Sequence, residues 1–205
     1  MKHFLLALCA AAALAAPAPA ASAENYSYWI EPCSQQLGRQ SGCEAADPEL
    51  AEWAFEAWQR ASGGALTFTR AAEERKARLR IYWAAGNAGL YGETAPIRVD
   101  GKRGAAVYVL PDVSQLGPQI AAACRNDRLF RHAIVYLTCL HESGHAIGLS
   151  HTAAYDDIMY FFGFGGDIVE YFARYRRKLH AREDIRRNPG LSPADERRLG
   201  ALYSK

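Results

Sequence analysis

A run of eleven residues, HESGHAIGLSH from His141 to His151, constrains what this chain can fold into more than any other feature of its sequence. His141 and His145 are four residues apart, so on a helix both imidazoles project from the same face. Gly148 can adopt backbone conformations that other residues resist, which lets the chain leave the helix and bring His151 back to the same point. Three neutral imidazoles with one open position are typical of a catalytic zinc site rather than a closed structural one. We therefore predict one Zn²⁺ ion bound by these three histidines.

Glu142 is offset by one residue from His141, so it cannot share the ligand face, but it can reach a water molecule on the metal. We predict that it acts as a general base. The alternative is a core helix that carries histidines by coincidence. The spacing HExxH occurs by chance in roughly one in 150 chains of this length, and the full eleven-residue pattern in roughly one in 100,000. His132 and His180 have no partner at ligand spacing, and we expect both to be structural or surface residues.

The eleven-residue segment resembles the signature of the metzincin metallopeptidases. Asp157-Ile158-Met159-Tyr160 follows shortly afterwards and is similar to the Met-turn of that family, with Met159 as its methionine. A tyrosine directly after the methionine is similar to the matrixin branch. Astacins and serralysins carry a zinc-binding tyrosine two residues after the methionine, where this chain has Phe161. The resemblance therefore implies that Tyr160 is a packing or pocket residue rather than a fourth ligand.

The resemblance implies an α+β fold, a metzincin-type catalytic domain. It has a twisted, mostly parallel sheet of about five strands with an antiparallel edge strand, a long active-site helix, the Met-turn and a C-terminal helix. The sequence patterns fit this order of elements. Strands are expected at residues 26–30, 65–69, 78–83 and 105–110, with a short Gly-rich edge strand within residues 86–94. Helices are expected from Asp47 to the Gly63-Gly64 break, from Asn126 or Asp127 to about Ile147, and from Ser192 onward with Leu199 and Leu202 inward.

The N-terminus has the pattern of an export signal. Lys2 precedes an apolar run from Phe4 to Ala16, and Ala21-Ser22-Ala23 is an A-x-A cleavage site. The alternative, a membrane anchor, needs about 20 apolar residues. We predict a signal peptide over residues 1–23, a catalytic domain over residues 24–205, no stable membrane span, and a secreted or periplasmic location. No room is left before the first strand for a cysteine-bearing propeptide, so we expect no zymogen.

Removal of the signal peptide leaves Cys33, Cys43, Cys124 and Cys139, an even number in an oxidising compartment. Cys33 and Cys43 flank a short polar loop and are the preferred disulfide pair. A bridge between Cys124 and Cys139 works only if the helix that carries Cys139 begins later than Asp127, because a long helical segment would hold the two sulfurs apart.

Residues 161–190 form an insertion between the Met-turn and the last helix. An amphipathic helix is expected at about residues 167–187, capped by Asp167, with its apolar stripe extending to Leu179. Its basic residues, Arg174, Arg177, Lys178 and Arg182, either form a solvated face or attract an acidic substrate. The aromatic residues before this helix are expected to line the pocket that, by resemblance, takes the residue after the cut; they are Tyr160, Phe161, Phe162 and Phe164.

The resemblance thus implies a secreted zinc endopeptidase whose substrate is a protein or an extended peptide added along a sheet edge. We place that edge at Ala88 to Gly92. Two alternatives stay open: an exported zinc protein that binds peptides without cutting them, and a zinc hydrolase of a non-peptide substrate. A formal net charge of +2 gives no argument for a nucleic-acid partner. The sequence does not indicate the oligomeric state.

Overall fold

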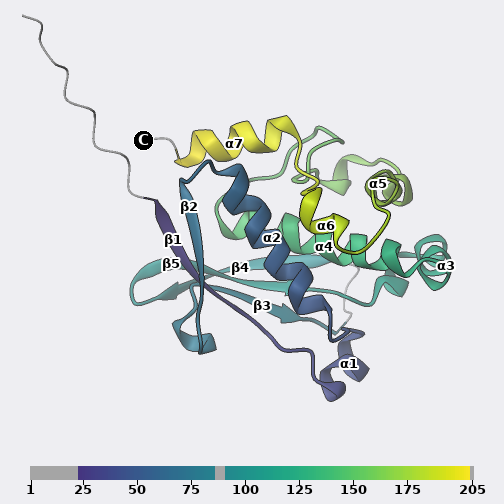
Figure 1. Cartoon of the computed structure of the whole chain (residues 1–205), viewed down its shortest axis with the longest axis horizontal. Helices are drawn as coiled ribbons and strands as arrows, with labels where there is room; N and C mark the ends of the chain where they lie inside the picture. The colour runs from purple at the N-terminus through teal and green to yellow at the C-terminus, as the bar shows by residue number, and fades with distance from the viewer. Residues whose placement is uncertain (1–22, 86–90, 204–205) are drawn as a thin grey trace, which may run out of the picture.

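The computed structural model of the protein describes residues 23–85 and 91–203. A five-stranded sheet has the strand order β2-β1-β3-β5-β4 (Figure 1). Its strands are β1 (Glu24–Ile30), β2 (Leu66–Arg70), β3 (Leu79–Trp83), β4 (Gly92–Val99) and β5 (Lys102–Val109). All neighbouring strands are parallel except β4 and β5, which are antiparallel. The predicted α+β fold, with its mostly parallel sheet and antiparallel edge strand, is confirmed.

The edge of the sheet differs from the prediction in its position. Strand β4 extends to Val99 and forms a hairpin with β5 through Asp100 and Gly101, whose φ angles are 50° and 74°. Positive φ at both central residues of a two-residue turn is the geometry that Asp-Gly favours in a hairpin. Strand β5 consequently begins at Lys102, three residues before the predicted start. Most of the predicted edge from Ala88 to Gly92 lies outside the described residues.

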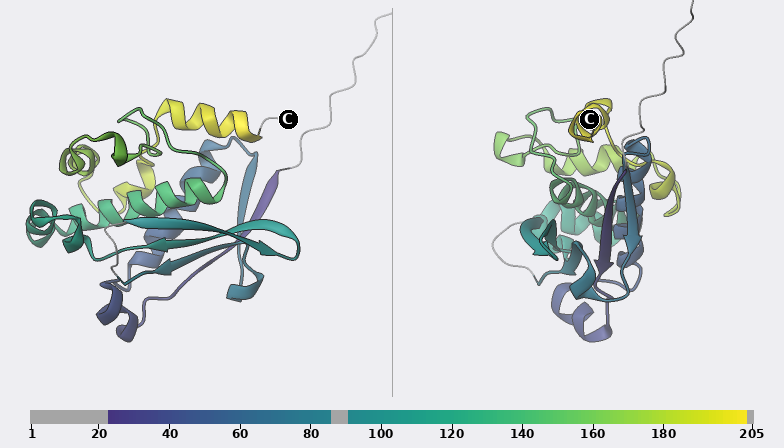
Figure 2. Two further views of the ribbon diagram at one scale, coloured as in Figure 1. Left: turned by 180° about the vertical axis from the view of Figure 1, so that it is seen from behind. Right: turned by 90° about the vertical axis from the view of Figure 1, so that its left-hand side faces the viewer.

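Two long helices, α2 (Asp47–Ala61) and α4 (Arg128–Ala146), pack against one face of the sheet (Figure 2). The inward face of β3 explains this packing, because Leu79, Ile81 and Trp83 alternate with more exposed residues. The indole of Trp58 on α2 donates to the backbone oxygen of Leu140 on α4 at 3.0 Å, which fixes the two helices against each other. The chain also forms smaller elements before, between and after these helices; these are α1 (Gln35–Ser41), α3 (Pro118–Asn126), and the 3₁₀ turns η1 (Glu74–Lys76), η2 (Val113–Leu116) and η3 (Phe162–Phe164).

The two long helices begin in different ways. Asp127 caps α4, since its carboxylate accepts the backbone N–H of Phe130 at 3.0 Å, and this is one of the two caps predicted. Helix α2 begins at Asp47, as predicted, but the carboxylate of Asp47 does not cap the helix and has another partner. Arg131 of α4 donates to both oxygens of Asp47, at 2.6 and 2.8 Å, and both side chains are buried. This ion pair joins the beginnings of the two helices.

The chain after the Met-turn forms α5 (Ile168–Arg176), α6 (Asp184–Arg187) and α7 (Pro193–Tyr203). The predicted continuous helix is therefore divided. Helix α5 ends at Arg176. Leu179, which was expected on the same helix, lies in the turn that follows and is buried there. The carboxylate of Asp184 accepts the backbone N–H groups of His180 and Ala181, so it stabilises that turn and the start of α6. On α7, Leu199 is buried as expected, whereas Leu202 is 47% exposed, contrary to the prediction.

Cys33 and Cys43 form a disulfide, the preferred pair. Cys124 and Cys139 are both free thiols. Helix α4 begins directly after Asp127, so the helical segment between Asp127 and Cys139 holds the two sulfurs too far apart for a bridge, as predicted. Across residues 23–85 and 91–203, the structure has no helix with both the length and the apolar character needed to pass through a lipid bilayer.

Candidate active site

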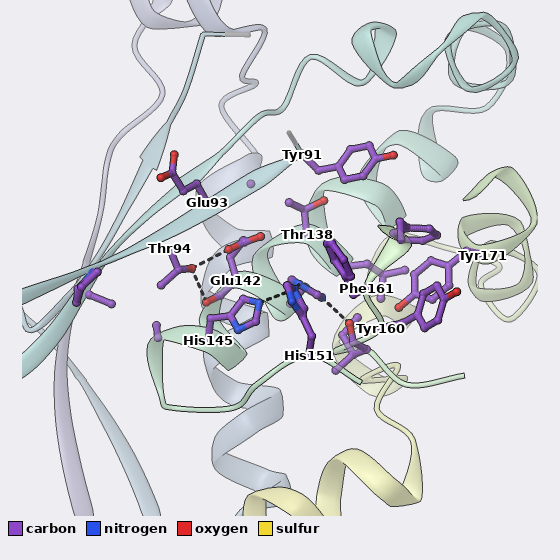
Figure 3. Close-up of a pocket in the computed structure, with 18 of the residues that line it drawn as sticks. Tyr91, Glu93, Thr94, Thr138, Glu142, His145, His151, Tyr160, Phe161 and Tyr171 are labelled. Atoms are coloured by element: carbon purple, nitrogen blue, oxygen red, sulfur yellow. Dashed lines mark hydrogen bonds between the residues drawn. The ribbon is translucent and has the colours of Figure 1, made fainter. Parts of the chain in front are cut away.

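The three histidines of the motif converge near the C-terminal end of α4. Figure 3 shows two of them, His145 and His151, beside Glu142. Nε2 of His151 lies 3.3 Å from Nε2 of His141 and 3.0 Å from Nε2 of His145. Backbone carbonyl groups orient the imidazole rings of His141 and His145. Nδ1 of His141 is 2.7 Å from the backbone oxygen of Ile158, and Nδ1 of His145 is 2.8 Å from that of Leu149. A carbonyl can only accept, so both Nδ1 atoms carry the proton. The Nε2 lone pairs of these two rings are left facing the third histidine.

This donor set fits a zinc ion. Tetrahedral zinc with Zn–N bonds of about 2.0–2.1 Å separates its nitrogen ligands by about 3.3 Å, close to the two distances here. The ligands must also be neutral, and burial lowers the pKa of each ring. It lowers the pKa of His141 to about 4, and it also lowers the pKa values of His145 and His151. All three imidazoles are therefore able to donate a lone pair at neutral pH.

Glu142 lies beside the histidines and is held by the edge strand. Thr94 on β4 places its Oγ1 2.7 Å from Oε2 of Glu142 and 3.0 Å from the backbone oxygen of the same residue. Burial raises the pKa of the Glu142 carboxyl to about 7; the Thr94 hydrogen bond opposes this rise and the charge of Glu93 adds to it. Strand β4 approaches this carboxyl very closely, because a Cβ at Gly92 would lie 2.5 Å from Cγ of Glu142.

The Met-turn lies beneath the histidines. Met159 is fully buried and fills the space beside Gly144 of α4, where a Cβ would be 2.5 Å from its sulfur. The turn is held in place by α7: Asp195 is buried, and its Oδ2 accepts the backbone N–H of Ile158 at 2.9 Å. The backbone oxygen of the same Ile158 orients His141. The C-terminal helix thus supports one of the candidate ligands through the Met-turn, a link that the sequence did not reveal.

A cleft of about 700 Å³ runs past the three histidines. Of the residues predicted for its wall, Tyr160, Phe161 and Phe162 line it. Phe161 also stacks on the imidazole of His151, with ring centroids 4.8 Å apart. Phe164 does not line the cleft and is 64% exposed, so the predicted wall is too large by one residue.

Several other residues of the cleft wall were not predicted from the sequence. The apolar end of the cleft is completed by side chains from α4, from α5 and from the residue before β4; these are Leu137, Thr138, Tyr171, Phe172 and Tyr91. The rings of Phe162 and Tyr171 meet edge to face at 5.0 Å, so the inserted helix forms part of the wall. The apolar stripe of α5 was recognised, but nothing in its sequence indicated which part of the molecule it would cover.

The basic residues of the insertion are largely engaged within the protein. Arg174 stacks on the rings of Tyr155 and Tyr171 and pairs with Asp156. Arg177 pairs with Glu170. Arg182 pairs with Glu49 and stacks on the ring of Trp53. These contacts favour the solvated-face interpretation of the helix over the steering of an acidic substrate.

The model of the matrixin family matches residues 22–164, more than half of the 205-residue chain. The matched region contains the sheet, helices α2 and α4, the three histidines and the Met-turn. It ends before α5, α6 and α7. No curated protein matches the chain.

Proposed function

Because the chain belongs to the matrixin family, we propose that it is an exported zinc-dependent endopeptidase, with Zn²⁺ on His141, His145 and His151 and Glu142 as the general base. One observation carries the proposal. The three Nε2 atoms converge at ligand spacing beside a buried carboxylate, within a cleft that is large enough for several residues of a peptide. A metallopeptidase domain of this family explains all of these features together.

Zinc bound by three imidazoles supplies Lewis-acid chemistry, since it polarises a carbonyl oxygen and lowers the pKa of water to about 7. The protein's own residues supply the proton transfer. Glu142 accepts a proton from the attacking water and passes it to the leaving amine. Thr94 donates to one carboxylate oxygen and holds it, which leaves the other oxygen to exchange the proton. Burial of Glu142 keeps the carboxyl away from bulk solvent, so the proton is delivered within the cleft.

The apolar end of the cleft is proposed to take the residue after the scissile bond. Tyr160, Phe162, Tyr171 and Phe172 give it an aromatic wall, which favours a bulky apolar side chain. Export is supported by the disulfide, because such bonds form and persist in oxidising compartments. The predicted signal peptide, residues 1–23, lies almost wholly outside the described residues, and its removal before Glu24 remains part of the proposal.

The proposal is tested with unfolded casein and with purified protein whose zinc content has been measured. We expect about one zinc per chain, hydrolysis that stops when a chelator is added, and recovery when zinc is returned. Glu142→Gln is nearly isosteric but cannot act as a base, so it should keep the metal and lose hydrolysis. His145→Ala is the matched control, because it should lose both. Zinc binding without hydrolysis of any protein would contradict the enzyme assignment and favour a peptide-binding role.

A further inference from the structure

The tip of the β4–β5 hairpin carries three cationic side chains, Arg98, Lys102 and Arg103, and one acidic residue, Asp100. None of the ion pairs within residues 23–85 and 91–203 involves any of these four residues. This distinguishes the hairpin from the inserted helix, where most of the arginines have carboxylate partners. The described residues therefore give these cations no carboxylate partner, and Arg98 donates from Nη1 to the backbone oxygen of Gly101 at 3.0 Å.

Two of the three cations belong to the cleft side of the sheet. Arg98 and Arg103 are directly opposite each other in the register of β4 and β5, so they share one face. It is the cleft face, because Gly92 and Thr94, which alternate with Arg98 on β4, both face Glu142 in the cleft. Arg103 lines the cleft directly. Lys102 precedes it on the same strand and therefore points to the opposite face.

The position of Arg103 is not explained by the packing around it. A Cβ at Gly148 would lie 3.4 and 3.6 Å from its two terminal nitrogens, so the guanidinium sits at the C-terminal end of α4. A cation is favoured there by the helix dipole, but only modestly. Among the described residues, no hydrogen bond joins this guanidinium to a helix carbonyl. Like charges directly opposite each other in a sheet are destabilising, which makes the pairing of Arg98 with Arg103 a cost to the fold.

We propose that Arg103, with Arg98 beside it, binds an acidic side chain of the substrate on the N-terminal side of the cut. This inference rests on the proposed function, because the aromatic end of the cleft is taken to hold the residue after the scissile bond. Residues before the bond then extend along β4 toward the hairpin tip. The substrate class is thus a peptide with an acidic residue upstream of the cut and a bulky apolar residue after it.

The register gives the position of the acidic residue. Thr94 contacts Glu142 and so marks the scissile bond, and Arg98 is four residues further along the strand. Four residues of an extended chain span about 13 Å. A peptide lying beside β4 would therefore present its fourth residue before the cut to the two guanidinium groups.

The test uses a zinc-loaded Glu142→Gln protein and a pair of fluorescent octapeptides with leucine after the central bond. One peptide has aspartate at the third and fourth positions before that bond, and its twin has asparagine. We expect the acidic peptide to bind about fivefold more tightly at low salt, the upper range for an exposed charge pair, and the difference to shrink at high salt. Adding Arg103→Gln and Arg98→Gln should make the two dissociation constants equal.

Lys102→Gln is the matched control. It removes the same charge from the adjacent residue on the other face, and the preference for the acidic peptide should persist. Equal binding of the two peptides to the Glu142→Gln parent, or a preference that survives both arginine changes, would overturn the inference. Its failure is separable from failure of the proposed function. Cleavage of the asparagine twin by wild-type protein tests the peptidase activity alone, and the ratio of the two binding constants tests the arginines alone.

Discussion

Replacement of Gly92 by alanine should inactivate the enzyme without removing its metal. The added Cβ would lie 2.5 Å from Cγ, 2.8 Å from Oε1 and 2.9 Å from Cδ of Glu142. Nonbonded carbon atoms approach to about 3.5 Å, so the carboxyl or the strand must move by about 1 Å. The φ angle of Gly92 is not among the positive values, so alanine is compatible with the backbone and the effect is steric.

A displacement of about 1 Å at a reacting group can lower a rate by about 100-fold. We therefore expect kcat/KM of Gly92→Ala on a peptide substrate to fall by about that factor, with zinc content unchanged because the three atoms nearest the added Cβ all belong to Glu142. Gly200→Ala is the control, since a Cβ at Gly200 on α7 has no neighbour within 4 Å. It should retain full activity. Near-normal turnover of Gly92→Ala with zinc bound would refute the placement of Glu142 or its role as the base.

Three further outcomes concern stability. Arg131→Leu leaves the buried carboxylate of Asp47 without its partner and should cost about 3–5 kcal/mol in a urea titration, whereas Arg177→Leu, on the surface, should change little. His132 has a pKa below 6.5, mainly through burial, so the unfolded chain takes up its proton first as the pH falls. The stability that comes from burying the neutral imidazole is present above about pH 6.5 and is lost below it. The free energy of unfolding of His132→Phe should therefore fall less between pH 7.5 and 5.5 than that of the wild type. An equal fall in the two proteins would contradict this. Asp195→Ala removes the acceptor of two backbone N–H groups and should cost about 2–4 kcal/mol, and a change below 0.5 kcal/mol would show that the Met-turn does not depend on it.

Local patterns predicted much of the fold. The spacing of His141 and His145 required a helix, and the Asp127 cap fixed its start. The hairpin was harder to predict from the sequence, because Pro96 within β4 argues against a strand. Proline is tolerated there because β4 is an edge strand, where one side of the backbone needs no partner in the sheet. The Asp-Gly pair at residues 100–101 was the signal that could have revealed the turn.

The contacts that position the site could not be predicted in this way. Thr94 and Glu142 are 48 residues apart, Ile158 and Asp195 are 37 apart, and Asp47 and Arg131 are 84 apart. Periodicity and capping describe neighbours within one helix or strand, so they contain no information on which distant polar groups meet. The motif therefore predicted the candidate ligands and the candidate base, while the residues that orient them became visible only in the tertiary structure.

In the proposed function, strand β4 links the proton transfer at Glu142 to the recognition of a peptide. Its cleft face carries Gly92, Thr94 and Pro96, and the small residue at position 92 lets the strand approach Glu142 closely enough for Thr94 to hold the carboxyl. Among the described strands β4 pairs only with β5, so its other edge can pair with an extended substrate. Because side chains alternate, a slip of one residue would turn Thr94 away and bring Glu93 toward the buried carboxyl. The Asp100-Gly101 turn that fixes this register is thus a determinant of the active site, although it lies at the far end of the hairpin.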